Sequence, residues 1–399
     1  MENSCVQLND LPDEILVIIL KKLAKVEVLY SLFDVNKRLN KISHDTVFTN
    51  DLPILMSASD DLIYSLPDQI LDRFCSYILP KIHEKIEWLH LESRSMERIL
   101  LATNYPNLYG ISLHNIQPKT AINLFTVVPL LHRMPNLEKL DLYLNVIERK
   151  TFFDGNDLKM NIINYMPQLN KFTFNICSLS SFYNEINLPS NEDIQKTFRD
   201  FNNKEIIYWA DYFPERRKGH CRIYSYPYKW KYYDDITNHF PGKIFIYVRS
   251  ISLYDERPFE HEFFLRIAES FPLMEELFVR NQKQQINKPI EKSKKLSIIK
   301  YPSLKQRFLN NTCIDYHEQF LFDTKTSLPF NVRVNMQYGL VKQVTHNFTS
   351  NTTRSNCAKI NFANLRKQMK FPEYSDDFST GKELFRKHIK DYFPHTQID

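Results

Sequence analysis

The sequence predicts a mixed α/β chain in which a small N-terminal helical module precedes a long array of alternating strands and helices. Two patterns predict this class. Residues 8–48 carry the apolar spacing of three short helices, and from residue 86 onward a proline followed by alternating apolar residues recurs at similar intervals. A third observation concerns function: the chain has only six glycines in 399 residues, too few and too isolated for the glycine-rich loops of nucleotide-binding sites.

The first predicted helix is apolar around most of its circumference. Pro12 suits a first helical turn, and Asp13 and Glu14 lie where the positive end of the helix dipole favours acids. At about 100° per residue, the apolar residues from Ile15 to Leu23 span roughly 260° of the helix. Only one side of such a helix can pack within so small a module, so the other side needs a further surface to cover it.

Two shorter helices are expected after the first. Val28, Leu29 and Leu32 follow a helical spacing, and Leu39 with Ile42 predicts a third helix that ends near residue 44. Three short helices form only a thin core, and a module of about 40 residues seldom folds without further packing.

This N-terminal pattern resembles the F-box, a module whose first helices dock on a Skp-family adaptor of cullin-RING (SCF-type) ubiquitin ligases. The resemblance rests on Leu11-Pro12-Asp13-Glu14-Ile15-Leu16, on the apolar run that ends at Leu20, and on Val35-Asn36-Lys37-Arg38-Leu39. The family often has cysteine or serine where Asn36 stands here, and tryptophan where Leu39 stands. The alternative is an N-terminal bundle that caps the array and has no partner. The resemblance implies an adaptor-binding surface, with Glu14 holding the loop before the helix, formed by Leu11, Pro12, Glu14, Ile15, Ile19, Leu20, Leu29 and Leu32.

The second pattern is a repeat of helix end, proline and short strand. Proline disfavours helix in the residue before it and lacks an N–H donor, so it ends the helix, and the alternating apolar residues that follow share one face of a strand. The clearest copies are 105–113, 134–142, 166–174 and 271–279, preceded by helical runs such as 122–128 and 263–268. The predicted strands start 22 to 32 residues apart, except for one interval of 79, at Ile86, Leu108, Leu137, Leu169, Val248, Met274 and Leu304.

These units resemble leucine-rich repeats, which implies an irregular solenoid whose curved sheet holds a target protein. Leu137-x-x-Leu140-x-Leu142-x-x-Asn145 fits the full pattern, and the copy ending at Cys177 is close to it, with asparagine or cysteine expected at a turn. Arg307 stands where an apolar residue belongs. Further strands are expected at 332–336 and 359–362, and the segment 382–393 is expected to cap the array. The alternative is a generic two-layer α/β domain.

The predicted organisation therefore has three parts: an F-box-like module at 1–50, a helical linker or first solenoid helix at 51–85, and the solenoid at 86–399 with an insertion around 178–247 and a C-terminal cap. Leu66-Pro67-Asp68-Gln69-Ile70-Leu71 repeats the start of the F-box motif, so a second F-box is an alternative for the linker. Pro80 and the strand expected at Ile86 follow too soon for two more helices, which favours the first helix of the array.

The insertion combines aromatic and basic residues. Large rigid rings supply contact area at little entropic cost, and cations select acidic or phosphorylated partners. Packing of these rings in the core of an enlarged repeat is the alternative, and stacking of single-stranded nucleic acid is a further one. The residues expected to contact a target protein are Tyr208, Trp209, Tyr212, Arg216, Arg217 and Trp230.

Several function classes have no motif in the sequence. The six glycines are isolated, which excludes the glycine-rich loops of nucleotide sites and the GxSxG elbow, and no HExxH is present. The six cysteines lack metal-ligand spacing, as expected for reduced thiols in the cytoplasm or nucleus, and neither a secretory signal nor a membrane span is expected. A net charge of +5 gives no preference for nucleic acid. We therefore expect a non-enzymatic substrate receptor without a cofactor or metal; the alternatives are a repeat scaffold unrelated to ubiquitination and an unrecognised hydrolase.

Overall fold

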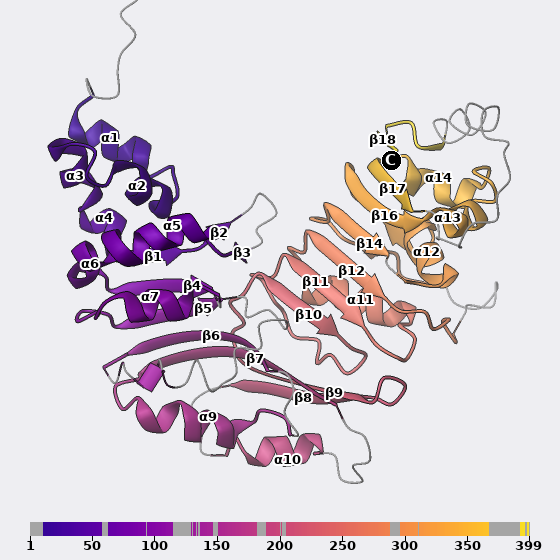
Figure 1. Cartoon of the computed structure of the whole chain (residues 1–399). Coiled ribbons are helices and arrows are strands. Elements are labelled where there is room, and N and C mark those ends of the chain that lie inside the picture. Colours follow the sequence, from indigo (N-terminus) through magenta and orange to yellow (C-terminus); the bar gives the residue numbers. More distant parts are fainter. Residues whose placement is uncertain are drawn as a thin grey trace, which may run out of the picture. The chain divides into compact units, whose positions relative to one another are not determined.

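The chain is mixed α/β, as the sequence predicts, and folds into two compact units, Met1–Tyr226 (unit 1) and Pro227–Asp399 (unit 2) (Figure 1). The predicted organisation has no boundary at this position. The computed structural model describes residues 11–57, 63–92, 94–114, 129, 131–132, 134, 136–146, 151–181, 189–199, 201, 205–287, 296–309, 311–366, 392–395 and 397–398.

Unit 1 begins with short helices at the positions that the sequence predicts. Asn36 starts one of them, because its side chain accepts a hydrogen bond from the Leu39 amide at 2.8 Å, and Asp45 caps the next helix by accepting from the Val47 amide at 2.9 Å. The helices are α1 (Asp13–Leu20), α2 (Lys25–Leu32), α3 (Lys37–Ser43) and an additional α4 (Thr46–Thr49).

The segment 51–85 is not purely helical, in contrast to the prediction. β1 (Asp51–Ile54) pairs in parallel with β4 (Trp88–Glu92) and forms the first strand of the sheet of unit 1. The rest of the segment contains the predicted helix, which runs on through a π-helical turn. Its elements are β2 (Met56–Ser57), β3 (Ile63–Tyr64), α5 (Asp68–Arg73), η2 (Phe74–Ile78), α6 (Leu79–Ile82) and η3 (His83–Lys85).

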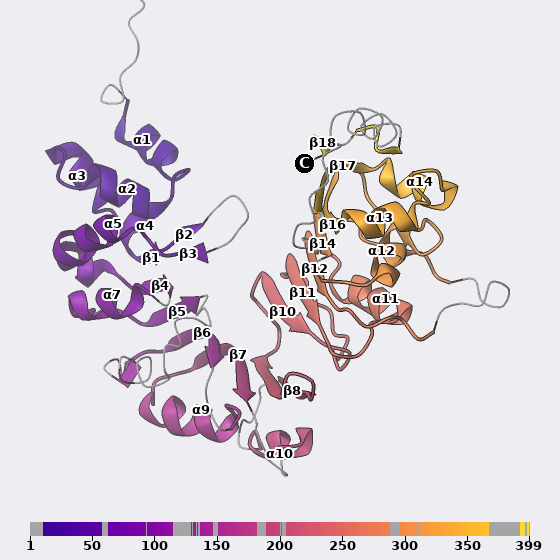
Figure 2. The same ribbon diagram turned by 45° about the vertical axis from the view of Figure 1, so that its right-hand side comes forward.

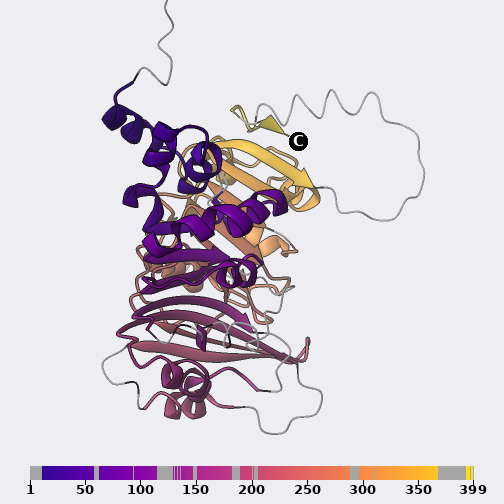
Figure 3. The ribbon, with the colours of Figure 1, turned by 60° about the vertical axis from the view of Figure 1, so that its left-hand side comes forward.

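The sheet of unit 1 has the order β1-β4-β5-β6-β7-β9-β8, and Figure 3 shows its strands side by side. The strands from β1 to β7 are parallel, whereas β7, β9 and β8 pair antiparallel. The remaining elements are β5 (Gly110–His114), β6 (Lys139–Val146), β7 (Lys171–Ser181), β8 (Ile206–Phe213), β9 (Lys218–Ser225), α7 (Met96–Ala102), α9 (Gly155–Asn161), η4 (Ile163–Tyr165) and α10 (Asn191–Lys196).

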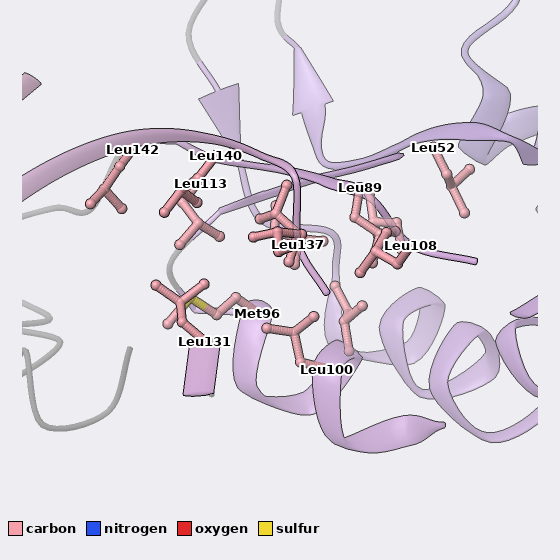
Figure 4. Close-up of a cluster of buried hydrophobic side chains, with 14 of the residues drawn as sticks. Leu52, Leu89, Met96, Leu100, Leu108, Leu113, Leu131, Leu137, Leu140 and Leu142 are labelled. Atoms are coloured by element: carbon pink, nitrogen blue, oxygen red, sulfur yellow. The ribbon is translucent and has the colours of Figure 1, made fainter. Parts of the chain in front are cut away.

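A single apolar core joins the N-terminal helices to this sheet. Leu89 on β4 pairs in register with Ile111, which in turn pairs with Leu140, so one row of apolar side chains runs beneath the strands. Figure 4 shows leucines from the strands pointing toward Met96 and Leu100 of α7. The same buried cluster includes side chains from α1 and α2, so the predicted boundary after residue 50 does not separate two cores.

Unit 2 is built on a second, all-parallel sheet with the order β10-β11-β12-β14-β16-β17-β18. Its helices lie on one side of the strands (Figure 2). The strands are β10 (Tyr232–Ile236), β11 (Ser250–Tyr254), β12 (Glu276–Arg280), β14 (Gln306–Leu309), β16 (Val332–Gln337), β17 (Ile360–Arg366) and β18 (Gln397–Ile398); β13 (Ile299–Lys300) and β15 (Thr326–Ser327) form a separate pair, and the helices are α11 (His261–Ser270), α12 (Ile314–Leu321), α13 (Tyr338–Val344) and α14 (Asn351–Cys357).

The predicted strands are confirmed with a constant offset. The seven strands that the repeat pattern predicts each begin two residues after the predicted start, because the predicted first residue lies in the connection before the strand. The strands expected at 332–336 and 359–362 correspond to β16 and β17, and the helix expected at 263–268 lies within α11. The helix expected at 122–128 and most of the cap expected at 382–393 lie outside the described residues, although Tyr392 and Phe393 are buried beside Phe348.

Two residues of the repeat pattern depart from expectation. Asn145 and Cys177 were expected at turns, but they pair with each other inside β6 and β7, because both strands continue beyond these positions. Arg307 keeps the register of β14 and occupies the interior position between Leu277 and Val334. It is fully buried, and no nitrogen of its guanidinium has a hydrogen-bond partner in the described structure.

Candidate docking surface on the first helix

The orientation of α1 is set by two leucines and an ion pair. Leu16 is fully buried and Leu20 is 5% exposed, so these side chains hold the helix on the core of unit 1. Arg38 of α3 donates a hydrogen bond from Nε to Asp13 Oδ1 at 2.6 Å and another to the carbonyl oxygen of Leu11. The beginning of α1 is therefore fixed from both the apolar and the polar side.

The opposite side of α1 presents isoleucines to solvent. Ile15, Ile18 and Ile19 are 43%, 57% and 42% exposed, and Leu23 just beyond the helix is 51% exposed. Residues three and four apart are neighbours on a helix, so the three isoleucines form one continuous apolar stripe. Burying a side chain of this type contributes about 1.5–3 kcal/mol when it is fully exposed beforehand. We call Ile15, Ile18, Ile19 and Leu23 the α1 stripe.

The platform beneath the α1 stripe is braced by polar contacts to later helices. Asp34, which follows α2, pairs with Lys81 of α6 at 2.6 Å and accepts a hydrogen bond from the Tyr77 hydroxyl at 2.5 Å. The hydrogen bonds from Lys81 and Tyr77 lower the pKa of the Asp34 carboxyl. The guanidinium carbon of Arg73 in α5 lies 4.8 Å from the ring centroid of Tyr30 in α2. These contacts hold the helical module against the helices that precede β4.

The predicted adaptor residues divide into accessible and inaccessible positions. Pro12 and Glu14 are exposed like Ile15 and Ile19, and Leu11 and Leu32 are half-buried. The prediction was wrong for Leu20 and Leu29. Both side chains are buried and cannot contact an adaptor, because the sides of α1 and α2 on which they lie pack against the core of unit 1.

The prediction that Glu14 holds the loop before the first helix was also wrong. Arg38, through Asp13 and the Leu11 carbonyl, holds the loop before α1, whereas Glu14 faces solvent. Ile18 and Leu23 were missed by the sequence-based choice, although a helical wheel would have placed Ile18 beside Ile15.

The six residues predicted to contact a target do not form one site. Trp209 is buried in β8, and Tyr212 donates a hydrogen bond from its hydroxyl to the Pro189 carbonyl at 2.5 Å. Arg216 and Arg217 are exposed in the β8–β9 turn, where Arg217 adopts a φ of 51°. Tyr208 is half-buried, and Trp230 belongs to unit 2. The aromatic and basic composition that predicted one target site thus came from residues in a buried strand, in a turn and in a different unit.

One cysteine–histidine contact lies inside unit 1. Cys177 Sγ is 2.7 Å from His220 Nε2, and both side chains are buried. Burial, assisted by the charge of Arg222, lowers the pKa of His220 to about 3, so this imidazole stays neutral at physiological pH. Among the described side chains, no three of His, Cys, Asp or Glu converge in a way that could ligate a metal ion.

No disulfide is formed in the described part of the chain by Cys75, Cys177, Cys221, Cys313 or Cys357. In the described part of the chain, no helix combines the length and the apolar character that a membrane span requires. The sequence matches no protein-family model and no curated protein.

Proposed function

We propose that this chain is the substrate-recognition subunit of a cullin-RING (SCF-type) ubiquitin ligase. In this proposal the N-terminal helices act as an F-box, the α1 stripe docks on a Skp-family adaptor, and the later strands form a leucine-rich-repeat-like solenoid that binds a target protein. The chain performs no chemistry itself, because other subunits transfer ubiquitin.

The observation that carries the proposal is the α1 stripe. A helix at the edge of a folded unit ordinarily turns its apolar side inward, and a contiguous apolar surface facing solvent marks an interaction site. Four large aliphatic side chains, each about half exposed, provide several kcal/mol of favourable burial before the entropic cost of association is subtracted. The motif from Leu11 to Leu16, which resembles the F-box, lies at the start of the same helix.

The rigidity of the surrounding module supports the same reading. Arg38 fixes the start of α1 through Asp13, and Lys81 fixes the end of α2 through Asp34. A surface held in place before binding loses less conformational entropy when the partner arrives. The stripe is therefore suited to docking on a preformed groove.

The experiment is a pull-down of the full chain with a Skp-family adaptor. Ile15→Asp combined with Ile19→Asp should abolish co-purification, because two carboxylates would have to be desolvated in an apolar interface. The matched control combines Leu101→Asp with Met160→Asp, since these side chains are 51% and 67% exposed on α7 and α9 of the same unit. Circular dichroism checks that both variants fold. Equal recovery of the adaptor by the two folded variants would contradict the proposal.

A second candidate function is a repeat scaffold unrelated to ubiquitination, in which the N-terminal helices only cap the array. The shared core of α1, α2 and the sheet favours it. Deletion of residues 1–50 does not distinguish the two functions, because it would expose Leu52 and its neighbours and destabilise unit 1 in either case. The substitutions at Ile15 and Ile19 do distinguish them, since a pure cap has no partner to lose.

A further inference from the structure

The sheet of unit 2 has one face that the helices described in this unit leave uncovered. Along β12, Leu277 and Val279 point to the buried side, where α11 to α14 lie (Figure 2), so Phe278 and Arg280 point to the other. Along β16, Val334 is buried and Arg333 is exposed on that same open side.

Two phenylalanines form the centre of this open face. Phe278 and Phe308 pair in register on neighbouring parallel strands, and their rings stack with centroids 4.3 Å apart at an angle of 2°. Both side chains are only half-buried. The stacked pair therefore presents the edges of two rings that are already ordered, and an apolar side chain can pack on them at low entropic cost.

Two arginines lie on opposite sides of Phe308. Arg280 and Arg333 are exposed, and neither forms an ion pair with another residue of the described structure. Arg333 on β16 aligns with Gln306 on β14, which aligns with Glu276 on β12. Arg280 lies four residues after Glu276, so the two arginines are two strands apart across the sheet and four residues apart along it. From the strand spacing and the rise per residue, the two backbone positions are about 10 Å apart across the sheet and about 13 Å along it. Phe308 occupies the midpoint of this diagonal.

We propose that this face binds an extended acidic segment of a partner protein with the order acid, any residue, apolar, any residue, acid. In an extended segment these three side chains share one side, and the two acids lie about 13 Å apart. The apolar side chain lies on the Phe278–Phe308 stack, and each carboxylate pairs with one arginine. Glu276 lies on the same face but off the diagonal, so it disfavours binding of the acids in another orientation.

The backbone positions of the two arginines are about 16 Å apart, which suits two separated carboxylates, one for each guanidinium. A single phosphate between the two flexible side chains is the competing ligand, which the phosphoserine peptide represents in the test. The inference deepens the proposed function, because it names the class of segment that a target would present. The binding itself needs no adaptor.

The test uses fluorescence anisotropy with the purified full chain and the labelled peptide Ser-Ser-Glu-Ser-Leu-Ser-Glu-Ser-Ser. The comparison peptides carry lysine in place of both glutamates, or one phosphoserine in place of both. We expect the acidic peptide to bind about tenfold tighter than the lysine peptide, and Arg280→Glu and Arg333→Glu each to weaken it about tenfold. Lys342→Glu makes the same charge change at an exposed position on α13 and should leave the affinity unchanged.

Equal binding of the acidic and lysine peptides would overturn the inference, as would unchanged affinity in both arginine variants. Tighter binding of the phosphoserine peptide than of the acidic peptide would show that the face prefers one phosphate to two carboxylates, and would also overturn the inference. The outcome is independent of the adaptor test, because Arg280→Glu should leave adaptor pull-down intact and the double substitution at Ile15 and Ile19 should leave peptide binding intact.

Discussion

Helices α1 and α11 are of similar length, yet they distribute their apolar residues in opposite ways. α11 buries Phe263, Phe264 and Ile267 and turns Glu262, Arg266 and Glu269 to solvent. α1 buries Leu16 and Leu20 but leaves three isoleucines outside.

The interior of unit 2 explains the behaviour of α11. Phe264 packs edge-on against Tyr316 and Phe320 of α12, with ring centroids 6.0 and 5.2 Å apart, so the unit completes its own core. No described segment does the same for the outer side of α1. Unit 2 thus covers the apolar side of α11, whereas the described part of the chain leaves one apolar side of α1 in solvent, and the proposed docking role of α1 rests on this difference.

The largest effect is expected inside α11. Phe264→Ala should lower the free energy of unfolding of unit 2 by about 3–5 kcal/mol, because it leaves a cavity among fully buried rings. Chemical denaturation followed by tryptophan fluorescence measures the change. A loss below about 1 kcal/mol would mean that this helix is less tightly packed than its burial indicates, and the contrast with α1 would weaken.

A second test of the packing in unit 2 is the buried charge of Arg307, which lies among the aromatic side chains of the core. Its guanidinium carbon lies 4.2 Å from the ring centroid of Phe320, which only partly offsets the loss of water. Arg307→Met should therefore raise the free energy of unfolding by about 1–4 kcal/mol. A fall in the thermal midpoint would show instead that the guanidinium has a stabilising partner.

Acid should weaken unit 2 through His317. Burial, with a further contribution from the charge of Arg307, lowers the pKa of this fully buried imidazole to about 4, below its unfolded value of about 6.5. Between these values the unfolded chain binds more protons, so the stabilisation is complete above pH 6.5 and is lost as the pH falls toward 4. The slope should approach about 1.4 kcal/mol per pH unit, and His317→Gln should flatten it in urea titrations at pH 4.5 to 7. An unchanged slope in that variant would contradict the assignment.

The smallest effect on stability is expected on the α1 stripe. Ile18→Ser should change the free energy of unfolding by no more than about 0.5 kcal/mol, because this side chain is already mostly in water. Thermal unfolding of the free chain tests this, with Leu16→Ser as the buried comparison on the same helix. A large loss at Ile18 would show that the stripe packs within the chain.

Local patterns predicted the strands well and the division of the chain poorly. Proline ends a helix through its own ring and missing donor, so every strand after such a turn could be placed from a few residues. The split between Tyr226 and Pro227 depends on contacts between distant residues, and no local signal marks it. β1 was missed because its four residues include Pro53 and follow helices without a turn signal.

The candidate site was predicted in part. The excess of isoleucine in α1 indicated an uncovered side, but the choice of individual residues followed the family motif and included Leu20 and Leu29, which the core of unit 1 buries. The open face around Phe278 and Phe308 was not predicted. Its residues come from strands about 30 positions apart, and only the register of the parallel sheet brings them together.

The most direct test of the central claim is calorimetric titration of the purified chain with a purified Skp-family adaptor at several temperatures. The account predicts binding with a negative heat-capacity change, because apolar surface is removed from water. It also predicts that Ile18→Ser reduces both this change and the affinity, while Leu101→Ser alters neither. Absence of binding, or binding that is indifferent to Ile18, would contradict the assignment of α1 as a docking helix.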